Sequence, residues 1–78
     1  MELNQETLEE MNHTFHWLES EYHLARNLVM ELQKQKRYLE DETDEEEIEI
    51  LKRQIKETET RLLNQLSDMG ENPEDYQR

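Results

Sequence analysis

A histidine-rich group near the N-terminus has residue types and spacings that could bind a metal ion. It consists of Glu9, His13, His16 and His23. If the segment is helical, the spacing places these side chains on one face, and imidazole and carboxylate groups are zinc ligands. Glu10-x-x-His13 also has the spacing found in bundle iron sites, but those ligands face inward from four helices. In the heptad described below, the histidines face outward. We therefore interpret them as surface residues and expect no metal site.

A block of acidic residues lies midway along the chain. The segment LEDETDEEEIEI, residues 39–50, has eight carboxylates in the ten positions 40–49. A calcium loop would need alternating Asp or Asn ligands and a central glycine, which this segment lacks. It is either a turn, a ligand for a basic surface, or both. The candidate partner-binding residues in this tip are Glu40, Asp41, Glu42, Asp44, Glu45, Glu46 and Glu47.

The sequence offers no catalytic signature. It has no cysteine, its two serines are Ser20 and Ser67, and its single glycine is placed to end a helix rather than to bind phosphate. Aromatic residues at helical spacing are typical of a core or of a dimer contact rather than of a ligand pocket. We expect no enzyme activity and no cofactor.

Charge and length limit the classes of partner. The 78 residues include 9 basic and 21 acidic ones, for a net charge of −12. Direct binding to nucleic acid or to an anionic membrane needs clustered Lys and Arg, so a protein with a basic surface is the expected partner. The N-terminal residues do not resemble a signal peptide, and no window is apolar enough for a membrane span. We expect a cytoplasmic protein.

The first half of the chain has an unbroken apolar heptad, which predicts one helix over about residues 5–40. Asn4 is placed to cap this helix, with Leu3 and Leu8 at the spacing of a hydrophobic staple. The seam has a polar interruption at Lys36. Its apolar positions are Leu8, Met11, Phe15, Leu18, Tyr22, Ala25, Val29, Leu32 and Leu39.

A second, weaker stripe predicts a helix over about 45–69. Thr43-x-x-Glu46 matches a capping box, and the heptad register changes across an expected turn at about 41–44. Gly70 and Pro73 end this helix, and 71–78 is expected to be a polar tail. Because no Gly or Pro lies between Leu39 and Ile48, a single long helix with a frame shift stays open as an alternative.

Together these patterns predict an all-α fold: an antiparallel helical hairpin over residues 1–70, in the form of a two-helix coiled coil. The first helix is longer than the second, so part of its apolar face is expected to overhang. This overhang favours a homodimer that forms a four-helix bundle from two hairpins. The residues expected on this oligomer or partner face are Leu8, Met11, Phe15, Trp17, Leu24 and Leu28.

Two functional hypotheses of different classes follow from these features. In the first, the protein is a non-enzymatic interaction or regulatory module that acts through its coiled-coil seam and acidic tip. In the second, its carboxylates mimic nucleic-acid phosphates, and it inhibits a DNA- or RNA-binding enzyme. A mimic needs negative charge spread along a face, whereas here the basic and acidic residues are mixed outside the tip.

Overall fold

The computed structural model describes residues 3–16, 18 and 20–76, with only the backbone of 20 and 21. Throughout this range, every regular element is helical, which confirms the all-α class. Three α-helices are followed by a short 3-10 helix: α1 (Gln5–His16), α2 (Ser20–Asp41), α3 (Glu45–Asp68) and η1 (Pro73–Tyr76). None of the described helices combines the length and the apolar character that a membrane crossing needs.

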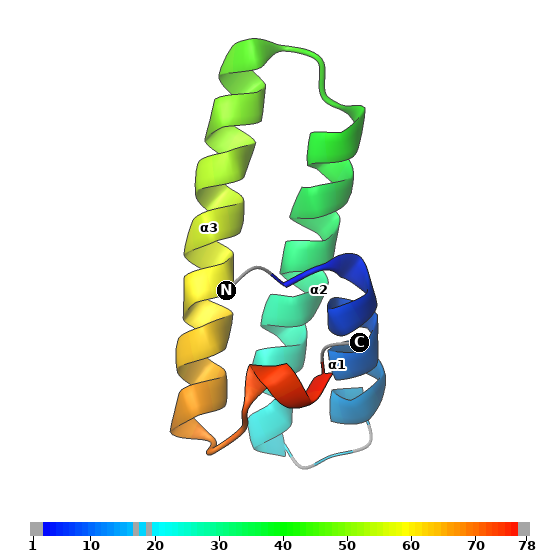
Figure 1. Ribbon diagram of the computed structural model, residues 1–78, viewed down its shortest axis with the longest axis vertical. Coiled ribbons are helices and arrows are strands. Elements are labelled where there is room, and N and C mark those ends of the chain that lie inside the picture. Colours follow the sequence, from blue (N-terminus) through cyan, green and yellow to red (C-terminus); the bar gives the residue numbers. More distant parts are fainter. Residues whose placement is uncertain (1–2, 17, 19, 77–78) are drawn as a thin grey trace.

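The three α-helices pack side by side, with α1 covering one end of the pair formed by α2 and α3. Figure 1 shows α2 and α3 running antiparallel, while α1 folds back along the part of α2 that is far from the α2–α3 connection. At a rise of 1.5 Å per residue, α1 is about 18 Å long, against about 33 Å for α2 and about 36 Å for α3. The half of α2 and α3 next to their connection is therefore left without a third helix.

The expectation of one helix over residues 5–40 is wrong, because the chain folds back between His16 and Ser20. No Gly or Pro marks this break, and the heptad passes through it undisturbed. Its physical reason is burial. In one continuous helix the first part of the apolar stripe would have no partner within the chain, whereas folding back places that part against the core.

The core joins side chains from all three α-helices. Leu8, Met11 and Phe15 of α1 are 0% exposed. Their buried partners come from the N-terminal segment, α2 and α3: Leu3, Ala25, Val29, Leu32, Leu62 and Leu66. Full burial of one such large apolar side chain contributes about 1.5–3 kcal/mol relative to exposure. The expected overhang of the first helix is therefore part of the intrachain core.

The N-terminal segment is held by hydrogen bonds at both backbone groups of Leu3. The Leu3 amide donates to Oε2 of Glu59 on α3, with an N–O distance of 3.1 Å. The Leu3 carbonyl accepts from Nζ of Lys36 on α2. Lys36, the polar interruption of the heptad, thus holds the segment that precedes α1. The expected cap is confirmed, since Asn4 Oδ1 accepts from the Thr7 amide at 2.8 Å.

The residues after α3 do not form only a solvated tail. Gly70 has a φ of 76°, and the Glu71 amide donates to the Leu66 carbonyl at 2.8 Å, which is the Schellman arrangement that reverses the chain. The chain then returns to α1, where the Tyr76 ring meets the Phe15 ring edge-on with centroids 5.5 Å apart. The expected helix stop at Gly70 is confirmed.

One carboxylate ties this C-terminal segment to α2. Glu71 Oε1 accepts from the Tyr22 hydroxyl at 2.6 Å, and Oε2 accepts from the Tyr76 hydroxyl at 3.1 Å. Burial raises the pKa of the Tyr76 phenol from 10.0 to about 12, and the hydrogen bond to Glu71 and its negative charge act in the same direction. No periodic pattern predicts this contact, because Tyr76 is a lone aromatic residue in a polar segment.

Replacing Leu8 by Ala should lower the free energy of unfolding by about 2–5 kcal/mol, because a fully buried side chain is removed. Leu24 is 55% exposed, so the matched substitution Leu24→Ala should change it by less than about 0.5 kcal/mol. Urea denaturation followed by circular dichroism measures both. Equal losses for the two variants would contradict the fold-back of α1.

A tyrosine titrating near pH 12 should appear in the wild type and be missing from Tyr76→Phe. Because the folded state holds this proton more tightly than the unfolded chain, the stabilising contribution of the phenol is present below pH 10.0. It is lost as the pH rises from 10.0 to about 12. Ultraviolet difference absorbance of tyrosinate follows the titration. Tyr38→Phe is the control, and a high-pH step that disappears in this variant instead would refute the assignment.

Candidate docking site at the open end of the bundle

The predicted acidic tip lies at the end of the bundle that α1 does not cover. Glu40 and Asp41 end α2, and Glu45, Glu46 and Glu47 form the first turn of α3. These five residues are exposed. The structure therefore brings the predicted tip residues together around one short connection, residues 42–44.

Two of the tip carboxylates hold this connection. Glu42 Oε1 accepts from the amides of Thr43 and Asp44, both at 3.0 Å. Asp44 has the extended backbone of a cap, with φ −78° and ψ 122°, and its Oδ1 accepts from the Glu46 amide at 3.0 Å. The N-cap of α3 is thus Asp44, and the capping box predicted from Thr43 is wrong by one residue.

The carboxylates of the tip therefore have two different roles. Glu42 accepts from two amides of the connection, and Asp44 accepts from the Glu46 amide, which has no partner within the first turn of α3. Acidic residues in the first turn of α3 also face the positive end of its dipole, which contributes about 0.3–1 kcal/mol per favourable position. The remaining exposed carboxylates are neighbours along the chain at two adjoining helix ends, and like charges gathered in this way repel one another at low salt.

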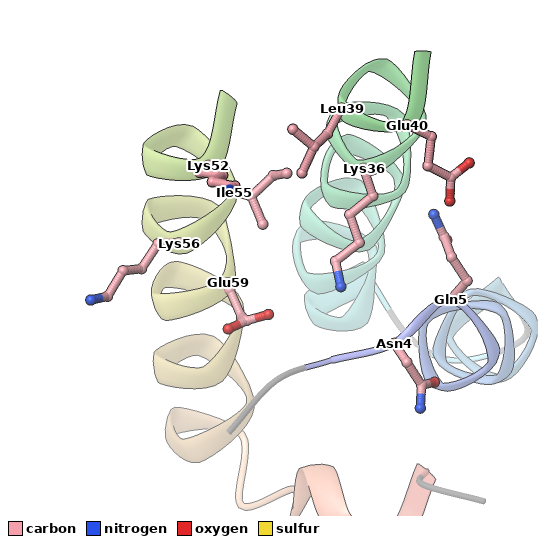
Figure 2. A pocket seen from close by; sticks show the side chains of 9 residues that line it. All are labelled: Asn4, Gln5, Lys36, Leu39, Glu40, Lys52, Ile55, Lys56 and Glu59. Carbon is pink, nitrogen blue, oxygen red and sulfur yellow. The ribbon is translucent and has the colours of Figure 1, made fainter. Parts of the chain in front are cut away.

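An open groove of about 570 Å³ adjoins the tip, on the side of α2 and α3 where α1 begins (Figure 2). Leu39 of α2 and Ile55 of α3 are half-buried and point toward each other across it. The groove is polar at its rim and apolar between the helices. Its lining residues are Asn4, Gln5, Lys36, Leu39, Glu40, Lys52, Ile55, Lys56 and Glu59.

The residues that line the groove carry more positive than negative charges, although the whole chain is strongly acidic. Three of its lining residues are lysines and two are glutamates, and Glu59 and Lys36 are also bonded to the Leu3 backbone. An ammonium group has three donors, so Lys36 keeps donors beyond the one that the Leu3 carbonyl accepts. Sequence reasoning missed this site. The available signal was the order of charges along α3, with glutamates near its start and lysines one to two turns later.

The predicted apolar partner face is largely internal. Leu8, Met11 and Phe15 are buried in the core described above, so they cannot serve as that face in this fold. Leu28 is half-buried against the core, whereas Leu24 is 55% exposed. Trp17 lies outside the described residues.

The histidine group is only partly brought together. His13 and His16 of α1 line a shallow hollow with Glu9, Asn12 and Arg26, and the Arg26 Nε donates to Asn12 Oδ1 at 2.9 Å. His23 lies on α2, is exposed and does not line that hollow. Among the described residues, no set of three or more His, Cys, Asp or Glu side chains has the geometry of a metal site.

Asp44→Ala should lower the free energy of unfolding by about 0.5–2 kcal/mol, because the Glu46 amide loses its acceptor. Thr43→Ala should change it by less than about 0.5 kcal/mol. The measurement is thermal denaturation in about 1 M salt, where the Debye length is about 3 Å. Charge repulsion is then screened, so the measured loss of stability reports the missing hydrogen bond alone. A larger loss of stability for Thr43→Ala than for Asp44→Ala would show that Thr43 is the N-cap residue.

Comparison of the chain with protein-family models, with characterised proteins and with solved structures found no significant match. No family is therefore assigned to it. Its function has to be inferred from the arrangement of its own side chains, above all from the tip and the groove at the open end.

Proposed function

We propose that the protein is a non-enzymatic interaction module that binds a protein partner with a basic surface through its acidic tip. The observation that carries the proposal is the excess of exposed carboxylates at the tip. Two of them hold the connection, while Glu40, Asp41, Glu45, Glu46 and Glu47 remain exposed. Their mutual repulsion costs stability, and a basic surface would turn that cost into attraction.

The groove beside the tip supports the same proposal. Complementary charges accelerate association and fix its orientation, whereas the affinity of an interface comes mainly from apolar side chains that become buried at its centre. At the open end, acidic side chains adjoin the half-buried pair Leu39 and Ile55. The tip would attract the partner, and the groove would bury apolar surface.

The nucleic-acid mimic is the less supported of the two hypotheses. A mimic of phosphates needs a continuous negative face. The exposed surface of α2 includes Lys34 and Arg37, and that of α3 includes Arg53 and Arg61. These cations interrupt the negative charge along both helices. We therefore propose the interaction module rather than the mimic. We also propose that it acts in the cytoplasm, as expected from the sequence.

Substitution of Gln for Glu40, Glu45, Glu46 and Glu47 should abolish partner binding while the fold is retained. Glu42 and Asp44 stay unchanged because they hold the connection. The control has the same change in net charge at four exposed glutamates elsewhere: Glu9, Glu31, Glu57 and Glu74. Each protein is immobilised and exposed to nuclease-treated lysate of the cells that produce it.

The wild type and the control should retain the same proteins, released by raising the salt from about 0.05 M to about 0.3 M. The tip variant should retain none of them. Circular dichroism shows whether all three proteins are equally helical. Retention of the same proteins by the tip variant would refute the role of the tip.

A further inference from the structure

The groove side of α3 carries its charges in a definite order along the helix. Lys52 and Lys56 line the groove, and Glu45 and Glu49 precede them by seven residues each. Residues seven apart lie on the same side of a helix, two turns from each other. All four side chains are exposed. This side of α3 is therefore negative near the tip and positive farther from it.

Helix α2 repeats this order. Glu40 is nearer the tip, Lys36 lies one turn farther from it, and both line the groove. Figure 2 shows Leu39 pointing toward Ile55 across the groove, with Lys36 next to it, while Glu40 lies on the side of α2 away from α3, near Gln5. The open end thus presents an apolar centre with negative charge on its tip side and positive charge on its far side.

Such a surface is complementary to itself. When two copies pack with their tips pointing in opposite directions, α3 of one copy runs antiparallel to α3 of the other. This pairing brings Glu45 opposite Lys56 of the second copy, and Glu49 opposite Lys52. A two-fold axis then repeats each contact, as in the isologous interfaces of most homodimers.

We propose that the open end binds a second copy of this chain in this antiparallel arrangement. The inference rests on the proposed function, because the tip residue Glu45 supplies the acidic half of one contact, and Glu49, one turn farther along α3, supplies that of the other. It adds the identity of the basic surface, which is formed by the groove lysines of the other copy. Leu39 and Ile55, left half-buried in the single chain, are covered in the dimer.

The dimensions of the open end agree with this pairing. The stretch of α3 from Glu45 to Glu59 is about 21 Å long, and α1 begins beside its far end, where Asn4 and Gln5 line the groove. The tip of the second copy would lie against this N-terminal end of α1. The positive end of the α1 dipole is a favourable neighbour for carboxylates.

The first measurement is the mass of the wild type in solution. Light scattering with size-exclusion chromatography, from about 1 µM to about 1 mM, should show a rise from the 9.7 kDa chain toward twice that mass. Salt at about 1 M should reverse the rise, because exposed charges are then screened beyond about 3 Å. A mass that stays at 9.7 kDa over the whole range overturns the inference.

Reversal of charge in two variants tests the geometry. An acidic variant has Lys52→Glu and Lys56→Glu, and a basic variant has Glu45→Lys and Glu49→Lys. Each variant alone would place like charges opposite each other, so its dimerisation constant should weaken at least about tenfold. In an equimolar mixture every contact is again between opposite charges. Native mass spectrometry should therefore show the heterodimer in preference to either homodimer.

The control variant is Arg53→Glu with Arg61→Glu, which changes exposed charges of α3 that do not line the groove. It should dimerise like the wild type. Association of the acidic and basic variants alone as strongly as the wild type, or no preference for the heterodimer in the mixture, overturns the proposed pairing. If the wild type stays monomeric in light scattering and the tip variant loses the proteins captured from lysate, only this inference is overturned. If the tip variant keeps those partners, the proposed function fails instead.

Discussion

The structure depends on the burial of the first apolar stripe against the rest of the chain. Leu8, Met11 and Phe15 have no partners in a continuous helix, and they become fully buried when the chain folds back between His16 and Ser20. A chain of this length buries few apolar side chains, so leaving three large ones exposed would remove a large part of its net stability. The other contacts follow from this arrangement. Tyr76 can pack on Phe15, and Lys36 can hold Leu3, only because α1 lies beside α2.

The same arrangement decides which end of the molecule is available. Since α1 is only about half as long as its neighbours, it covers the end of the bundle far from the tip and leaves the other end open. The sequence predicted an uncovered apolar region too, but placed it on the first helix. In the structure a half-buried apolar pair, Leu39 and Ile55, lies in the groove next to the acidic tip instead. Charge and apolar surface therefore meet at one place, which is what an interface requires.

Local patterns in the sequence predicted much of this fold. The helical class, the Asn4 cap and the stop at Gly70 follow from short-range rules. The break after His16 does not, because it is caused by long-range burial and no helix-breaking residue marks it. The capping-box pattern predicts the cap of α3 one residue early, since Thr43 and Asp44 are both good capping residues and only the backbone distinguishes them. The sequence predicts the antiparallel pairing of these two helices, but the heptad marks Lys36 only as a polar interruption of the seam, and the end that α1 leaves open follows from the fold-back, which no local pattern predicts.

Amide hydrogen exchange at two protein concentrations tests most directly the claim that one end of the bundle is closed and the other is an interface. At low concentration, amides between Leu8 and Phe15 and between Thr58 and Leu66 should exchange only through global unfolding, while those from Leu39 to Leu51 open locally. At high concentration, protection should increase at the open end alone. Fast exchange in α1, or an increase in protection along α1 rather than at the open end, would contradict this account.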